Sequence, residues 1–208
     1  MILFLLASIL AISVAAWSNQ DLMKRFVFNA YLVKQRKEYY RFLSSGFLHS
    51  NWIHLGFNLF VLYQFSNGLR YRLFDLGWYT SDWEIVILFL LGVILSEVPS
   101  YFRHQENPHY NSLGASGGVS SVVFTSIMLN PVKMKLGLIF IPVYLPAFLF
   151  GILYLIYSHF QSKQNGDNIN HDAHLYGALF GVVFAVVYYP ETFGMFLTEI
   201  ASWDGSLF

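Results

Sequence analysis

A single serine, Ser116, stands among glycines in the stretch NSLGASGGVSSVVF, which runs from Asn111 to Phe124. A serine hydroxyl attacks a carbonyl carbon when a nearby base takes its proton and when hydrogen-bond donors stabilise the oxyanion that forms. Backbone N–H groups at the start of a helix can be such donors, because they have no acceptor within the helix. Ser116 and the backbone of Ala115 therefore offer a nucleophile and part of an oxyanion site.

Two other segments carry polar side chains inside apolar sequence. The stretch NHDAHLYGALFG places His174 one turn before Gly177, where its imidazole could act as the base. The stretch HSNWIHLGFN places His54 and Asn58 four residues apart, hence on one helical face, with His49 near the start of the segment. His54 and Asn58 could donate to the same oxyanion, or they could be a pair that holds two helices together.

The carboxylate closest in sequence to His174 is Asp172. Side chains two residues apart on a helix do not face each other, so Asp172 is badly placed to orient the imidazole. We expect Asp172 to cap the helix instead. A serine and a histidine alone, without a carboxylate, then complete the catalytic group.

The composition indicates where these groups work. Of 208 residues, 56% are hydrophobic and only 12% are charged, which is too few ionised groups for the surface of an ordinary soluble globule. The net charge is zero, so the dense basic surface required for nucleic-acid binding is absent. The chain has no cysteine, which excludes disulfides, thiolate nucleophiles and Cys-ligated metals. A multi-pass membrane protein in contact with the lipid bilayer is the class that remains.

The sequence predicts an all-α fold in one membrane domain, residues 1–208. Each predicted span is an apolar segment flanked by aromatic or charged residues or ended by a proline, and there are six: about 1–17, 49–69, 83–101, 114–129, 138–158 and 173–189. The first could also be a cleaved signal, although it lacks a basic start. Residues 18–48 mix cations with aromatics, as interfacial segments do, and residues 190–208 form a tail.

Glycines are concentrated in the fourth and sixth predicted spans. Gly177 and Gly181 stand four apart in the sixth, while Gly114, Gly117 and Gly118 lie at the head of the fourth. Small residues let membrane helices bring their backbones close together. We therefore expect these two spans to pack against each other, which would bring Ser116 and His174 together; the glycines could also be packing surfaces without a catalytic purpose.

Taken in order, these motifs resemble the rhomboid family of intramembrane serine proteases. GASG at Gly114–Gly117 is similar to the family's G-x-S-G, and HSNWIHLGFN to its second-helix pattern of histidine and asparagine. AHLYGALFG at Ala173–Gly181 is similar to its sixth-helix A-H-x-x-G-x-x-x-G, and Tyr40-Arg41 stands where the family often has Trp-Arg. The first motif alone is weakly specific, but the three together are strongly so.

The resemblance implies a six-helix bundle with a short central fourth helix and a Ser116–His174 dyad in a water-filled cavity. It assigns the oxyanion site to His54, Asn58 and the Ser116 amide, with no metal and no cofactor. Its substrates would be transmembrane segments of other proteins, and its active site would open to the extracytoplasmic side of the plasma or inner membrane. It also implies that the first loop braces the bundle and that the fifth helix gates entry, for which Pro142, Pro146 and Gly166 are suited.

Two features depart from the family pattern. The family commonly has an aromatic residue four positions after the nucleophile, stacked on the catalytic histidine, whereas this chain has Ser120. His174 must then be held in another way. The family orientation would also put the more basic loops outside, against the positive-inside tendency.

Three other functions are alternatives to a serine protease. A catalytically inactive rhomboid-like protein that binds or escorts membrane helices usually lacks the serine or the histidine, and both are present here. A metal-dependent membrane protease using His49, His54 and His174 would need a carboxylate base, and the H-E-x-x-H pattern is absent. A transporter should have matched broken helices in two halves, which the sequence lacks. The substrate and the oligomeric state are left open.

Overall fold

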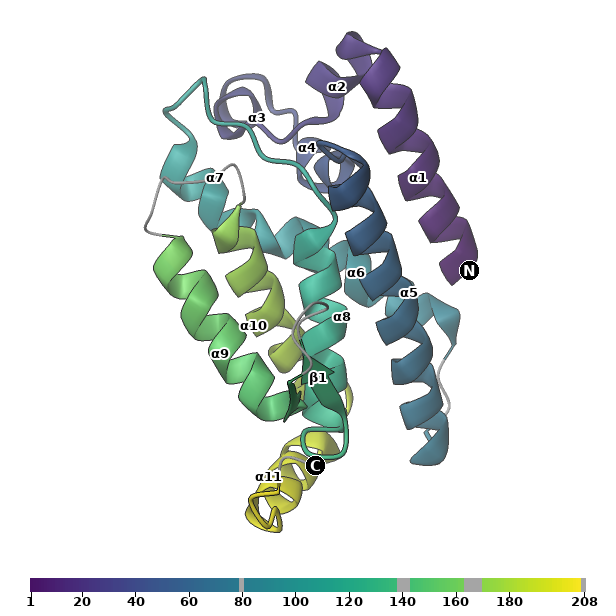
Figure 1. The fold of residues 1–208 in the computed structure, drawn as a ribbon. Helices are drawn as coiled ribbons and strands as arrows, with labels where there is room; N and C mark the ends of the chain where they lie inside the picture. The colour runs from purple at the N-terminus through teal and green to yellow at the C-terminus, as the bar shows by residue number, and fades with distance from the viewer. Residues whose placement is uncertain (79–80, 138–142, 163–169, 207–208) are drawn as a thin grey trace.

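The computed structural model describes residues 1–208 except 79–80, 138–142, 163–169 and 207–208. Long helices run side by side and short helices gather at one end (Figure 1). The long ones are α1 (Ile2–Ser18), α5 (Trp52–Asp75), α6 (Asp82–Ser96), α8 (Ser116–Leu129), α9 (Ala147–Gln161) and α10 (His171–Tyr188). The prediction of a mostly helical fold is confirmed.

Helix α8 lies at the centre, with α5, α6, α9 and α10 around it (Figure 1). Nearly all of its residues after Ser116 are buried, including the hydroxyl-bearing Ser120, Ser121 and Thr125. Two of its serines donate their hydroxyls to carbonyl groups of the preceding turn: Ser121 Oγ to Gly118 at 2.7 Å and Ser126 Oγ to Val122 at 2.9 Å. A helix that is apolar or small on every side is suited to such a central position. The predicted fourth helix is therefore present and is short and central, while its crossing of a membrane stays a prediction.

Local signals explain where the surrounding helices begin. Asn51 caps α5 by accepting from the His54 N–H at 2.9 Å, and Ser81 with Glu84 forms a capping box at the start of α6. Helix α6 ends at Ser96, and α7 (Val98–His104) follows with a proline in its first turn. Because proline lacks an N–H and clashes with the preceding turn, it separates α6 from α7.

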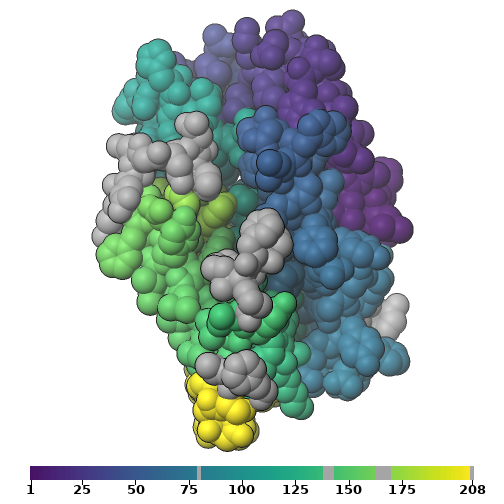
Figure 2. All heavy atoms as spheres, viewed as in Figure 1, coloured from purple at the N-terminus to yellow at the C-terminus, as the bar shows by residue number. Residues whose placement is uncertain are grey.

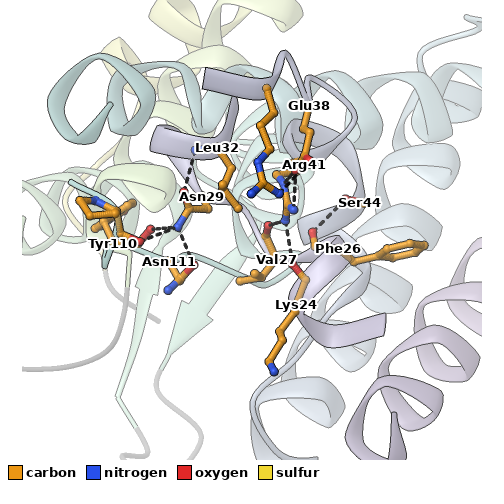
Figure 3. Close-up of polar contacts among 12 residues, drawn as sticks. Lys24, Phe26, Val27, Asn29, Leu32, Glu38, Arg41, Ser44, Tyr110 and Asn111 are labelled. Atoms are coloured by element: carbon orange, nitrogen blue, oxygen red, sulfur yellow. Dashed lines mark hydrogen bonds and ion pairs between the residues drawn. The ribbon is translucent and has the colours of Figure 1, made fainter. Parts of the chain in front are cut away.

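The segment between α1 and α5 folds into four short helices at one end of the bundle: α2 (Gln20–Phe26), α3 (Ala30–Arg36), α4 (Arg41–Ser44) and the 3-10 helix η1 (Ser45–Phe47). Arg41 organises them from a buried position (Figure 3). Its guanidinium donates to the carbonyl oxygens of Lys24 at 2.9 Å and Val27 at 2.7 Å, and pairs with Glu38 at 2.6 Å. Charge-assisted hydrogen bonds of this kind are strong, so this segment has a defined structure of its own.

The outer faces of the bundle are apolar. Helices α5 and α9 occupy opposite flanks of the face in Figure 2, and both expose large apolar side chains, among them Phe57, Phe60, Phe74, Ile152, Leu153 and Phe160. Many exposed apolar side chains on the outer helices are typical of contact with lipid. By length and hydropathy together, two helical stretches of the described chain could cross a membrane, Asp82–His104 and His171–Tyr188. The helices α1, α8 and α9 are apolar but shorter, so six spans stay a prediction.

The fifth predicted span begins later than expected. Strands β1 (Lys135–Gly137) and β2 (Tyr144–Pro146) pair antiparallel, with Leu136 opposite Leu145, and α9 starts only at Ala147. Pro146 ends the strand and precedes the helix, since a proline inside the helix would remove a hydrogen bond. The expected gate residues Pro142 and Gly166 lie outside the described residues.

The expected tail contains one more helix, α11 (Glu191–Ala201), at the end of the bundle opposite the short helices (Figure 1). Arg72 of α5 joins it to the core. The Arg72 guanidinium donates to the Leu129 carbonyl at the end of α8 at 2.9 Å and pairs with Glu199 of α11 at 3.0 Å. Arg72 thereby connects the last turn of α8 to both α5 and α11.

Candidate active site

Ser116 is the first residue of α8, and it is partly accessible to solvent, unlike the buried residues that follow it. The chain enters this helix through Gly114, whose φ of +131° is a conformation that glycine adopts readily. A Cβ at Gly114 would lie 3.0 Å from His54 Nε2 and 3.8 Å from Ser116 Oγ. Gly114 thus leaves room between the His54 ring and the Ser116 hydroxyl.

His54 and Asn58 lie in the first two turns of α5, on one face as the spacing predicted. His54 Nδ1 is 3.3 Å from Ser50 Oγ, so its Nε2 is the nitrogen that faces Gly114. Asn58 is buried, and its Nδ2 donates to the His54 carbonyl at 3.0 Å. An amide nitrogen carries two N–H groups, so Asn58 keeps a second donor.

The glycines bring the starts of α8 and α10 together. A Cβ at Gly177 would lie 2.2 Å from the Gly117 carbonyl oxygen, and one at Gly181 would lie 2.3 Å from that of Ser121. Contacts this short mean that the two backbones touch with no side chain between them. Ala173 lies one turn before Gly177 in α10, and a Cβ at Gly117 would be 3.5 Å from its carbonyl oxygen. The residues directly after Ser116 and directly before His174 are therefore neighbours, and the predicted packing of the two helices is confirmed.

A buried polar cluster, missed by the sequence analysis, ties the two helix starts a second time. Glu97, between α6 and α7, accepts from Ser112 Oγ at 2.7 Å and from Asn170 Nδ2 at 3.1 Å. Asn170 Nδ2 also lies 2.9 Å from Ser112 Oγ. Ser112 lies four residues before Ser116, and Asn170 four before His174, so one carboxylate links both segments. The signal was a Glu at the end of an apolar helix.

The expected role of Asp172 was wrong. The cap of α10 is Asn170, whose Oδ1 accepts from the Ala173 N–H at 3.1 Å. Asp172 is the second residue of the helix, and its carboxylate forms an ion pair with Arg103 of α7. The distinction could have been drawn from the sequence, because asparagine is as good a cap as aspartate.

His49 is fully buried and supports Ala115, the residue before Ser116. Its Nε2 accepts from the Ala115 N–H at 3.4 Å, and its Nδ1 is 3.0 Å from Ser13 Oγ, which donates to the Phe47 carbonyl. Burial, and to a smaller degree the nearby His54, lower the pKa of His49 to about 3. The neutral ring can accept at Nε2, which fits this role. The Ala115 N–H, expected to face the oxyanion, is engaged by His49 in this structure.

The short helices also hold the segment that leads to Ser116. Phe28 and Ser112 exchange backbone hydrogen bonds of 3.0 Å, and the Gly114 N–H donates to the Ser45 carbonyl at 3.0 Å. Asn29 Nδ2 donates to the Tyr110 carbonyl at 3.1 Å and to Asn111 Oδ1 at 3.0 Å (Figure 3). The first loop thus fixes the segment that leads to Ser116 and braces this end of the bundle, as the resemblance implied.

His174 lies in the first turn of α10 and is partly accessible. Its ring centroid is 5.7 Å from that of His171, which is buried, at an edge-on angle of 74°. In the part of the chain that the structure describes, no three His, Asp or Glu side chains are grouped as metal ligands. The chemistry that these residues can perform is proton transfer, nucleophilic attack and hydrogen-bond donation.

The arrangement defines a helical membrane protein built around a short central helix, with a serine at the start of that helix next to a helix that carries a histidine. The chain belongs to the rhomboid family, since the Rhomboid domain matches residues 36–191. Over 140 residues, it is 31% identical to the zebrafish (Danio rerio) presenilin-associated rhomboid-like protein A, mitochondrial. That match covers 66% of this chain and 34% of the relative, so the chain spans about a third of the relative's length.

Proposed function

We propose that this chain is an intramembrane serine protease that hydrolyses peptide bonds in or near transmembrane segments, with Ser116 as nucleophile and His174 as base. The observation that carries the proposal is the backbone contact of Gly177 with Gly117, which places the start of α10 against the start of α8. The Glu97 cluster supports it, because it joins Ser112 to Asn170 by an independent set of hydrogen bonds.

The chemistry follows from the residue types. Ser116 Oγ attacks the scissile carbonyl carbon while His174 accepts the hydroxyl proton, and a tetrahedral oxyanion forms. Collapse of this intermediate breaks the C–N bond, the leaving amine takes the proton from His174, and an acyl ester remains on Ser116. A water molecule, deprotonated by His174, then attacks the ester and releases the second product.

The oxyanion requires donors that are already in place. The Ser116 N–H belongs to the first turn of α8, so its acceptor must come from outside the helix. His54 Nε2 is directed toward Gly114, next to Ser116, and it carries a proton when Nδ1 accepts from Ser50. Asn58 holds a second amide N–H one helical turn further on. These three donors are the proposed oxyanion site.

A regular helix hides its carbonyl groups within its own hydrogen bonds, so the substrate must unwind at the cleavage site. Segments with glycine, proline or serine near the cut unwind at lower cost, since these residues are poor helix formers. We therefore expect transmembrane segments with such residues to be the preferred substrates.

The decisive experiment compares wild-type protein with Ser116→Ala in detergent, using a model single-span substrate that carries a helix-weakening pair. The substitution should lower kcat by at least about 10³-fold while the thermal unfolding midpoint stays unchanged. A serine-reactive fluorophosphonate should label the wild type and leave Ser116→Ala unlabelled. Equal cleavage by both proteins would overturn the proposal.

The rival function, a binding protein that escorts membrane helices without cleaving them, gives a different result in the same experiment. Such a protein would bind the substrate with equal affinity before and after Ser116→Ala and would not react with the probe. The presence of both a serine and a histidine at adjoining helix starts favours the protease.

We further propose that the chain lies in the cell's plasma or inner membrane, with Ser116 near the extracytoplasmic side. Because the chain has no cysteine, a single His109→Cys variant can report the side on which the loop before Ser116 lies. His109 is exposed, so a membrane-impermeant thiol reagent should label it on intact cells. Labelling only after the membrane is opened would reverse the orientation.

A further inference from the structure

An aromatic ring accompanies His174, and it comes from α9. The ring of Tyr154 is stacked on the imidazole, with centroids 6.3 Å apart and planes inclined by 16°. The position on α8 that could have carried such a ring is occupied by Ser120. Among the described residues, an aromatic ring stacked on the imidazole therefore comes from a different helix from Ser116.

The hydroxyl of the same tyrosine contacts α8. Tyr154 Oη lies 3.0 Å from Ser120 Oγ, within hydrogen-bonding distance, and Ser120 is buried. Ser120 follows Ser116 by four residues, hence on the same face of α8. Tyr154 thus connects the face that carries the nucleophile to the helix that carries the histidine.

A second contact limits the freedom of the Tyr154 ring. Phe124, a further four residues along α8, packs against it with centroids 5.6 Å apart. A ring that packs at a tilt of 48° against Phe124 and whose hydroxyl is hydrogen-bonded to Ser120 has few rotamers left. The ring can therefore restrain the orientation of a neighbouring imidazole by stacking on it.

Other described side chains near His174 do not stack on its ring. His171 meets the imidazole edge-on, and Tyr157 of α9 meets His171 in turn at 5.7 Å. Asp172 is held by Arg103. Stacking, which restrains rotation of the ring about its χ angles, is supplied by Tyr154.

We propose that Tyr154 is a positioning residue for His174, and that it makes the alignment of the base depend on where α9 lies. This inference rests on the proposed protease function. The ring holds the imidazole plane, and the Ser120 hydrogen bond holds the ring. A displacement of α9 withdraws both restraints at once, while Ser116 and α10 stay in place.

The test measures kcat, KM and the pH profile of cleavage for three variants. Tyr154→Leu removes the ring and should lower kcat by about 10-fold to 10²-fold with little change in KM, because a small misplacement of a catalytic group has effects of that size. The acidic limb of its pH profile should shift, since the imidazole changes its surroundings. Tyr154→Phe keeps the ring and should retain most of the wild-type kcat.

The hydrogen bond is tested separately. Ser120→Ala and Tyr154→Phe each remove it, so they should lower kcat by the same modest factor, and the double variant should be no slower than either. Additive losses would overturn the proposed coupling between the two side chains. This pair changes one hydroxyl at a time, so it carries the test even if Tyr154→Leu fails to fold.

Phe160→Leu is the matched control, because Phe160 is an exposed aromatic residue on the same helix. It should keep the wild-type kcat and pH profile. An active, Ser116-dependent wild type together with a Tyr154→Leu variant of unchanged kcat and pH profile would overturn this inference and leave the proposed function standing. Loss of the Ser116 dependence would instead overturn the proposed function.

Discussion

Helix α8 meets α10 and α9 in two different ways. Against α10 the contact is made by backbone, with Gly177 on Gly117 and Gly181 on Ser121. Against α9 it is made by side chains, with Phe124 and Ile127 of α8 facing Tyr154 and Gly151. Backbone contacts admit one arrangement only, whereas side chains can change rotamer and refill space. The comparison indicates that α8 and α10, which carry Ser116 and His174, form a fixed pair and that α9 is the adjustable neighbour.

The strongest way to break this comparison is Gly177→Ala. The new methyl would lie 2.2 Å from the Gly117 carbonyl oxygen, so α8 and α10 must separate. We expect a loss of about 3 kcal/mol or more in the free energy of unfolding, with cleavage abolished. Thermal unfolding in detergent measures the first and substrate cleavage the second.

Gly68→Ala is the control for that substitution, because a Cβ at Gly68 would have no other atom within 4 Å. Gly68 lies in the interior of α5, where alanine is favoured over glycine by up to about 1 kcal/mol. The variant should be as stable as the wild type or slightly more so. Equal destabilisation by both substitutions would contradict the special closeness of α8 and α10.

A smaller effect, the dependence of stability on pH, tests whether the rigid contact of α8 with α10 extends to His49 and Ala115. The folded protein holds the pKa of His49 at about 3, below the ordinary value of 6.5. As pH falls from 6.5 toward 3, the unfolded chain binds a proton at this residue and the folded protein does not, so the folded state loses stability. The slope contributed by one such group approaches about 1.4 kcal/mol per pH unit.

The measurement is the unfolding midpoint as a function of pH for wild type, His49→Gln and His109→Gln. A glutamine can still accept from Ala115 and does not titrate, so His49→Gln should flatten the acid dependence. His109 is exposed, so its replacement should leave the curve unchanged. Parallel curves for all three proteins would mean that His49 does not hold Ala115 through its neutral ring.

The smallest effect is expected on the α9 side. A Cβ at Gly151 would lie 3.3 Å from Ile127 Cδ1 and 3.4 Å from Phe124 Cε1, and both are ends of side chains that can move. Gly151→Ala should change the free energy of unfolding by about 1 kcal/mol or less. A loss as large as that of Gly177→Ala would show that α9 is as fixed as α10.

Much of this arrangement could be predicted from the sequence, because the deciding residues carry a strong local signal. Glycines four apart predicted the packing of α10 on α8, and the apolar run before Asn130 and Pro131 predicted the short α8. The family motifs predicted Ser116, His174, His54 and Asn58 as the catalytic group, and those roles stay a prediction. Each of these signals lies within one segment, so no knowledge of the other segments was needed.

What the sequence did not reveal depends on contacts between distant segments. Tyr154 is one of many aromatic residues in the chain, and only the placement of α9 brings its ring to His174. Glu97, Ser112 and Asn170 belong to three separate segments, so their cluster has no sequence pattern. The strands before α9 were missed because an apolar run reads equally well as a strand or a helix.

The length of α8 has a consequence for the surrounding lipid. Fourteen residues at about 1.5 Å each make a rod of about 21 Å, shorter than a hydrocarbon layer of about 30 Å. In the proposed membrane protein, a rod of this length whose Arg72-bound end lay at one membrane surface would leave its Ser116 end roughly 9 Å below the other surface. The proposed hydrolysis consumes water, so solvent would have to reach Ser116 at that depth.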